Sequence, residues 1–202
     1  MKSVNILLIV LKGGGNMKYI NPDIESSYKE NDIGSTLYEY VLTHKPKIII
    51  EFGTLYGYSA AAMAMALDEL NNGGKIICYD LWEKYPYKHS VISQTKQNLE
   101  KYNLSKYVEF KELNFKDWIP ENFDLLHLDI SNDGTSILDL SIKCHNELKS
   151  GKHILFEGGS VERDNVEWML KYNKQPINSV KPFVQYEVLS PKFPSISKLI
   201  YK

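Results

Sequence analysis

Short apolar runs alternate with longer segments of helical period along this chain. Runs rich in Val, Ile, Leu and Phe predict strands at residues 47–52, 75–81, 107–113, 123–130, 153–156, 184–189 and 196–201. Helical spacing of apolar residues, or an abundance of Ala and Leu, predicts helices at residues 32–44, 58–70, 89–102, 135–149 and 161–172. This alternation predicts an α/β fold, a doubly wound sheet that ends in an antiparallel strand pair.

The most informative stretch joins the strand at 47–52 to the helix at 58–70. The strand ends in Glu51, and the turn that follows carries Gly53 and Gly57. Strand, glycine turn and helix place backbone N–H groups at a helix N-terminus beside a ligand. Gly53 can adopt backbone angles that other residues avoid, and it leaves room for that ligand. The plainer alternative is an ordinary connecting turn with incidental glycines.

The carboxylate of Glu51 narrows the choice of ligand. A dinucleotide-binding turn would need glycine at this position, and an acid there would repel a pyrophosphate. A ligand with an amino group or hydroxyls is favoured instead.

Acidic residues also lie at the ends of three other predicted strands, at Asp80, Asp129 and Glu157. Because ligands of doubly wound sheets bind at the carboxyl ends of the strands, these acids indicate a functional site at that edge. Packing alone does not explain buried strands that each end in a carboxylate.

Glu51, Gly53 and Gly57 match the first motif of the class I S-adenosylmethionine (SAM) methyltransferases, and the chain resembles this family from about residue 32 to its end. The resemblance implies a Rossmann-like seven-stranded sheet with helices on both faces. It also implies SAM as cofactor and methyl transfer to an oxygen or nitrogen of a small molecule. The nearest branches in pattern are small-molecule O-methyltransferases and their cephalosporin-hydroxylase-like relatives.

The resemblance also implies roles for individual residues. Asp80 stands where the family holds the ribose hydroxyls with an acid, and Asp129 ends the fourth strand beside the active site as a candidate base. The other candidates are Tyr58, Trp82, Asp117 and Trp118 for the cofactor, with Glu157 and Arg163 for the substrate.

Each of these candidates has a plainer interpretation. Asp80 would cap the next turn, the aromatic residues would pack at the edge of the core, and Glu157 with Arg163 would form a surface ion pair. We expect His127 to be a packed core histidine.

Departures from the family restrict the function. Metal-dependent members have an Asp-Asn pair after the fifth strand, whereas this chain has Glu157-Gly158-Gly159, so no metal is expected. The net charge of −1 and the single arginine, Arg163, argue against a nucleic-acid partner. Two alternatives stay open: a SAM-fold binding or oxygenase-like protein without methyl transfer, and an NAD-binding oxidoreductase, which Glu51 disfavours.

Composition fits one domain, with 43% hydrophobic and 24% charged residues in 202. No apolar segment reaches the roughly 20 residues of a membrane helix. Cys78 and Cys144 make no disulfide framework, and we expect reduced thiols in a cytoplasmic protein. Whether the chain forms a homodimer stays open.

The first residues have a different character. A glycine run at residues 13–15 precedes Met17, as a translated ribosome-binding site would. We therefore expect residues 1–16 to be a non-structural extension and residues 17–202 to form a single domain. The alternative is an additional strand at residues 4–11.

A chain that starts at Met17 should therefore melt at the temperature of the full chain. Thermal unfolding followed by circular dichroism measures this directly. A clearly lower melting temperature for the shortened chain would show that residues 4–11 are part of the fold.

Overall fold

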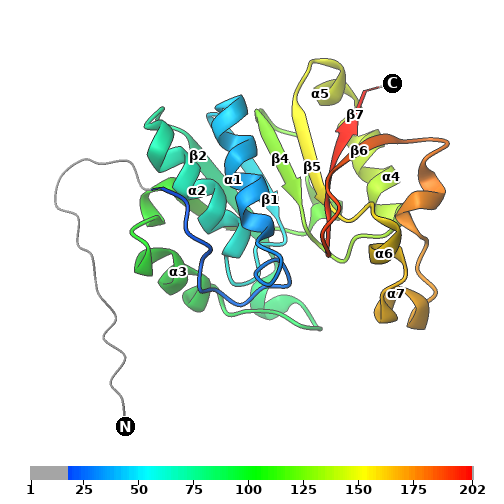
Figure 1. Cartoon of the computed structure of the whole chain (residues 1–202), viewed down its shortest axis with the longest axis horizontal. Helices are drawn as coiled ribbons and strands as arrows, with labels where there is room; N and C mark the ends of the chain where they lie inside the picture. Colours follow the sequence, from blue (N-terminus) through cyan, green and yellow to red (C-terminus); the bar gives the residue numbers. More distant parts are fainter. Residues whose placement is uncertain (1–17, 202) are drawn as a thin grey trace, which may run out of the picture.

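A seven-stranded mixed sheet forms the centre of the molecule, in the order β3-β2-β1-β4-β5-β7-β6 (Figure 1). A computed structural model describes residues 18–201. Its strands are β1 Ile48–Phe52, β2 Lys75–Asp80, β3 Val108–Glu112, β4 Leu125–Leu128, β5 His153–Glu157, β6 Gln185–Ser190 and β7 Ile196–Ile200. β1 to β5 are parallel, and β7 runs antiparallel to both of its neighbours. This confirms the predicted fold class. The proposed extension at residues 1–16 lies outside the described residues and stays a prediction.

The helices agree with the sequence pattern, with two exceptions. They are α1 Ile33–His44, α2 Tyr58–Leu70, α3 Ile92–Lys101, α4 Gly134–Lys143, α5 His145–Lys149, α6 Val161–Asp164 and α7 Glu167–Lys171. The predicted helix at 135–149 is interrupted at Cys144, whose ψ of 23° departs from the helical value. The predicted helix at 161–172 is interrupted before α7, where Val166 has an extended ψ of 150°.

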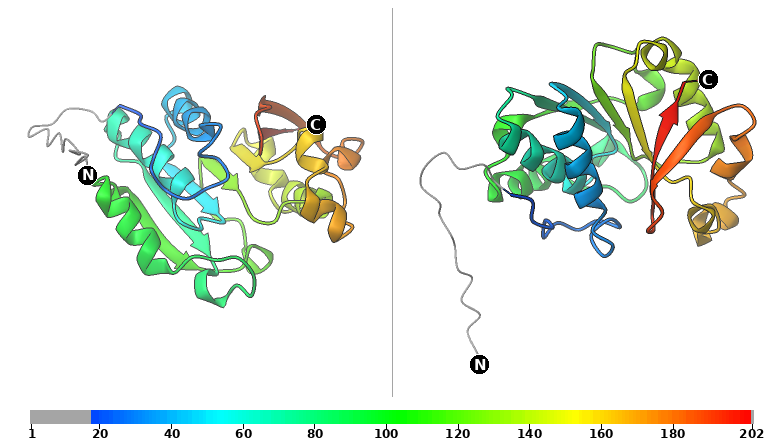
Figure 2. Two further views of the ribbon diagram at one scale, coloured as in Figure 1. Left: turned by 60° about the horizontal axis from the view of Figure 1, so that its bottom comes forward. Right: turned by 45° about the horizontal axis from the view of Figure 1, so that its top comes forward.

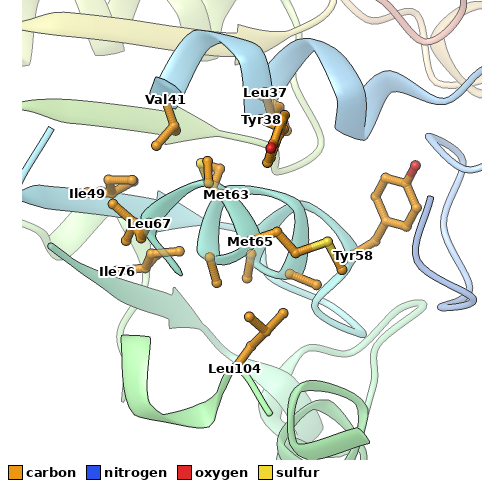
Figure 3. Close-up of a cluster of buried hydrophobic side chains, with 14 of the residues drawn as sticks. Leu37, Tyr38, Val41, Ile49, Tyr58, Met63, Met65, Leu67, Ile76 and Leu104 are labelled. Carbon is orange, nitrogen blue, oxygen red and sulfur yellow. The ribbon is translucent and has the colours of Figure 1, made fainter. Parts of the chain in front are cut away.

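The alanine-rich helix α2 packs beside α1 on one face of the sheet. Val41 of α1 lies over Met63 of α2, and on the other side Leu67 lies next to Ile49 and Ile76 of the strands (Figure 3). Each fully buried side chain of this size stabilises the fold by about 1.5–3 kcal/mol. The small alanines of α2 let both neighbours approach closely, so this layer fixes the position of the turn that precedes α2.

The opposite face of the sheet has its own core. Ile137 and Leu140 of α4 pack there with Ile50, Leu126 and Ile154 of the central strands. The views in Figure 2 show β6 and β7, coloured orange to red, continuing the sheet beyond β5. Both faces of the central strands are therefore covered, as is usual for a parallel sheet.

Strand register brings three polar residues together on the α1 and α2 side of the sheet. Glu51 of β1 pairs with Cys78 of β2 and with His127 of β4. Side chains alternate between the two faces of a strand, so Ile49 and Glu51 share one face while Ile50 takes the other. The polar row thus lies next to the apolar core of that layer, close to the carboxyl ends of the strands.

The turn between β1 and α2 requires glycine at position 53. Gly53 has φ +85°, and a Cβ atom there would lie 1.7 Å from the carbonyl oxygen of Asp129. The amide of Gly53 also donates to the Tyr79 carbonyl at 3.0 Å. Gly53 therefore allows the ends of β1, β2 and β4 to meet.

Gly53→Ala should lower the free energy of unfolding by about 2 kcal/mol or more beyond the loss caused by Gly73→Ala. Gly73 is a matched control because its φ is +75° but nothing lies within 4 Å of its Cβ position. It therefore isolates the strain of the left-handed backbone, about 1–2 kcal/mol. Urea denaturation of both variants measures the difference, and equal losses would contradict the close approach of Asp129.

Candidate active site

The carboxyl edge of the sheet gathers the acids that the sequence singles out. Phe52 pairs with Tyr79 and with Leu128, and Leu128 pairs with Phe156. The residues that follow these positions therefore emerge at one level, among them Asp80, Asp129 and Glu157. The segment that precedes α1 also lies at this edge (Figure 1). The structure thus assembles one site from residues of four strands and an N-terminal segment.

Helix α2 begins at this edge with free backbone donors. Its N-cap is Gly57, and no side chain caps the helix. The first N–H groups of a helix have no partner within the helix, and they attract negative charge. These donors suit the carboxylate of an amino-acid moiety. A Cβ atom on Gly57 would lie 3.1 Å from Thr95 of α3, so this glycine also lets the two helices pack closely.

Asp80 is fixed at the rim of the glycine turn. One of its carboxylate oxygens accepts the amide of Leu55 at 2.8 Å, and the other accepts the amides of Leu81 at 2.6 Å and Trp82 at 3.0 Å. The capping role that the sequence left as an alternative is therefore present. A carboxylate offers about four lone-pair sites, so the partly exposed Asp80 retains capacity for a ligand hydroxyl.

Glu51 lies deeper in the protein than a residue that only contacts a ligand would. Its side chain is wholly buried, and it accepts from the imidazole of His127 at 3.2 Å and from the thiol of Cys78 at 3.5 Å. The hydroxyl of Tyr28 lies 3.4 Å from the second ring nitrogen of His127. His127 is buried as expected, but its two ring nitrogens face polar partners. The predicted contact of Glu51 with a cofactor stays a prediction.

Asp129 lies at the centre of the edge. The hydroxyl of Tyr28 and the charge of Glu157 both act on its pKa. Burial raises the pKa of Asp129 to about 7, and the negative charge of Glu157 adds to the rise. Near neutral pH this carboxyl can therefore both release and accept a proton.

Glu157 and Arg163 form a buried pair, so the surface pair weighed as an alternative is wrong. Each residue is only 4% exposed. The guanidinium donates to both oxygens of Glu157, through Nε and through Nη2 at 2.9 Å. It also donates to the carbonyl of Asn132 at 3.3 Å and lies over the ring of Trp168 at 4.8 Å. Burial raises the pKa of Glu157 while the charge of Arg163 opposes the rise.

The predicted cofactor-flanking aromatic residues Tyr58 and Trp82 are buried in local packing. Tyr58 donates to the side chain of Asn21 at 2.7 Å and meets the ring of Tyr28 edge to face. Trp82 packs against Phe110, and its indole nitrogen has no hydrogen-bond partner within residues 18–201. Their roles at a cofactor stay predictions.

The two residues predicted near the adenine differ in burial. Trp118 is buried against Phe52 and Phe123, and its indole nitrogen donates to Glu121 at 3.3 Å. Asp117 is exposed. The structure therefore gives Trp118 a packing role, while the proposed adenine contacts stay predictions.

Tyr28 is the site residue that the sequence does not reveal. It comes from an irregular segment, 99 positions away from His127. Other residues of the site can be recognised in the sequence. His127 and Asp129 are two positions apart, so a strand projects both side chains to the same face.

Within residues 18–201, His, Cys, Asp and Glu residues form no group of three or more able to hold a metal ion. No helix in the same range has the length and apolarity to cross a membrane.

Several solved structures resemble this chain. The SAH-bound methyltransferase PaMTH1 of Podospora anserina is 16% identical with a TM-score of 0.57, over 88% of this chain and 80% of that one. An O-methyltransferase of Bacillus cereus in complex with SAH is 18% identical with a TM-score of 0.57, over 90% of this chain and 84% of that one. TomG of Streptomyces achromogenes, an O-methyltransferase involved in tomaymycin synthesis, was solved in complex with SAM. It is 14% identical with a TM-score of 0.54, over 87% of this chain and 86% of that one. These likenesses concern the fold.

Sequence comparison identifies the family. No curated protein matches the chain. A family model described as a methyltransferase domain matches residues 50–157, from β1 through β5, which is more than half of the chain. This range contains the glycine turn, Asp80 and Asp129. The chain therefore belongs to this methyltransferase family, which confirms its resemblance to the class I SAM-dependent enzymes.

Proposed function

We propose that this chain transfers a methyl group from SAM to an oxygen or nitrogen of a small molecule. The observation that carries the proposal is the meeting of the glycine turn, Asp80 and Asp129 at one edge of the sheet. Neighbours in fold were solved with SAM or SAH, which supports the choice of cofactor.

The residues at this edge fit the parts of SAM. Asp80 would accept the ribose hydroxyls with the lone pairs that the loop amides leave free. The uncapped N-terminus of α2 would receive the carboxylate. When bound, this cofactor supplies a methyl group already activated on a sulfonium. The protein then mainly provides alignment, exclusion of water and a base.

Asp129 is the proposed base. Its pKa of about 7 matches the range in which a general base works best at neutral pH. A hydroxyl or amine of the acceptor would give its proton to this carboxylate as the new bond to carbon forms.

The acceptor would lie between the ends of β4 and β5. Asp129 follows β4, and Glu157 ends β5 with Arg163 bound to it. Nη1 of Arg163 has no hydrogen-bond partner within residues 18–201, so this nitrogen is the part of the guanidinium left for an anionic group on the acceptor.

Asp80→Ala should weaken SAM binding roughly ten- to a hundredfold, because losing a hydrogen-bonded charged partner costs about 1.5–3 kcal/mol. Calorimetry with SAM, SAH and NAD measures affinity and choice of ligand together. Asp139→Ala, an exposed acid of α4, is the control for charge. Since Asp80 also holds three loop amides, melting temperatures must accompany the titrations. Unchanged affinity of a folded Asp80→Ala variant would remove the ribose assignment.

Asp129→Asn should keep SAM affinity and lower turnover by roughly 10²–10⁴, the usual contribution of a general base. In the unmodified protein, turnover should rise with pH at or below about 7, since only the ionised carboxyl accepts a proton and a bound cationic cofactor lowers its pKa. The variant should lose this rise. Labelled SAM and a panel of small hydroxy and amino compounds would identify an acceptor and then give the pH profile. Full turnover in the variant would rule out the base.

A further inference from the structure

Buried polar atoms without a hydrogen-bond partner gather at the carboxyl edge of the sheet. Within residues 18–201 they belong to the side chains of Thr54, Trp82, Asn132 and Arg163. Each of these residues lies in a segment that leaves the carboxyl end of a strand, namely β1, β2, β4 or β5. Folded proteins pair nearly all of their buried polar atoms. Unpaired atoms that all lie at one edge therefore point to ligand groups at that edge.

The side chain of Asn132 can take only one orientation. Its Nδ2 donates to the carbonyl of Leu128 at 3.0 Å and to the carbonyl of Glu157 at 2.9 Å. Carbonyl oxygens only accept hydrogen bonds, so exchanging Nδ2 and Oδ1 would destroy both contacts. Asn132 thus ties the ends of β4 and β5 together, and its Oδ1 is a wholly buried acceptor without a donor.

Arg163 offers the complementary atom. Its Nε and Nη2 donate to Glu157, and Nη2 also donates to the backbone carbonyl of Asn132 at 3.3 Å. Nη1 is then the donor that stays unpaired. One free acceptor and one free donor therefore belong to two residues in direct contact. Asp129 lies three positions before Asn132 and is partly exposed, so a molecule can reach this end of β4 from solvent.

The start of helix α4 does not compete with Arg163 for an anionic group. Asp133 caps this helix by accepting the amide of Ser136 at 2.9 Å. The amide of Gly134 donates to the carbonyl of Gln175 at 2.7 Å. Because these helix-start donors are engaged, Nη1 of Arg163 is the donor left for a ligand oxygen between β4 and β5.

The charges at this place select the kind of ligand. Glu157 offsets the charge of Arg163, and Asp129 adds a further carboxyl. A ligand that is only anionic would bring one more negative charge to carboxyls that already outnumber the arginine. A ligand with an ammonium beside its carboxylate is neutral as a whole, and its positive end is attracted by the carboxyls. Hydrogen bonds from such charged groups are also stronger than those between neutral groups.

We propose that Asn132 and Arg163 bind the α-amino and carboxylate groups of an amino acid that serves as the methyl acceptor, which rests on the proposed function. The ammonium donates to Oδ1 of Asn132, and the carboxylate accepts from Nη1 of Arg163. The side-chain oxygen or nitrogen that is methylated faces Asp129. SAM has an amino-acid end too, but that end belongs to the N-terminus of α2, so the two groups occupy different places.

The test measures binding of free amino acids to the full chain saturated with SAH, which fills the position of the cofactor's own amino-acid end. Ligand-detected NMR screens the common L-amino acids, including serine, tyrosine and lysine. The strongest binder is then compared with its carboxamide and with the analogue that lacks the α-amino group. Each change should weaken binding roughly ten- to a hundredfold, because each removes one charged hydrogen-bond partner.

Variants assign each loss to one residue. In Asn132→Ser the hydroxyl can still donate to one of the two carbonyls, but Oδ1 is gone. Removal of the α-amino group should then cost less than about threefold, while amidation of the carboxylate keeps its full cost. Arg163→Lys should show the reverse, because an ammonium has no planar fork to hold Glu157 and a second carboxylate together. It tests the proposal independently if Asn132→Ser fails to fold.

Asn165→Ser is the matched control. Asn165 follows α6, and its Nδ2 also donates to a backbone carbonyl, that of Val161 at 2.7 Å, but the residue is exposed. Both costs should stay at their full size in this variant. Melting temperatures show which variants are folded.

Three results would overturn the inference. One is a loss on removal of the α-amino group that is equal in Asn132→Ser and in the unmodified chain. Another is a carboxamide that binds as tightly as the amino acid, which would indicate a neutral ligand group. The third is SAH binding without binding of any amino acid, as expected if only water pairs with Oδ1 and Nη1. Failure to bind either SAM or SAH would instead defeat the methyltransferase assignment itself.

Discussion

The parallel pairing of β4 between β1 and β5 is the constraint on which the site depends. This strand aligns His127 with Glu51 on one side and with Leu155 on the other. A register shift of one residue would turn His127 and Asp129 to the opposite face, where Leu126 and the core under α4 now lie. The cost of burying these groups against apolar side chains makes that shift unfavourable, so packing and site geometry are set by the same strand.

The buried ion pair of Glu157 and Arg163 matters more for stability than the pairs on the surface. Removing one partner of a buried pair such as Glu157 and Arg163 costs about 3–5 kcal/mol, whereas an exposed pair such as Lys84 and Glu112 contributes less than about 1 kcal/mol. Helix α6 has only four residues and would not form alone. Its cap at Ser160 and the pairing of Arg163 with β5 therefore hold it over the site.

Sequence pattern predicts the parts of the fold that depend on local order. Helix α2 spans residues 58–70 as expected, since a buried alanine-rich helix between turns is recognisable locally. The break after α6 cannot be recognised from the local sequence. It depends on Asp164, whose carboxylate accepts the backbone amides of Ile177 and Asn178 from a distant loop. Tyr28 escapes prediction for the same reason: its partners meet only in the folded chain. The aligned acids were predictable because parallel strands end at a common edge.

The balance of charge at this edge would link the bound cofactor to the proposed base, Asp129. Glu51, Asp129 and Glu157 are three carboxyls, and the arginine beside them is already bound to Glu157. Asp129 is therefore the carboxyl whose ionisation a further positive charge controls. A cation nearby favours the ionised form of an acid, so a cationic cofactor at this edge would lower the pKa of Asp129 from about 7. The proposed base would then be ionised to a larger extent when the cofactor is bound than in the empty site.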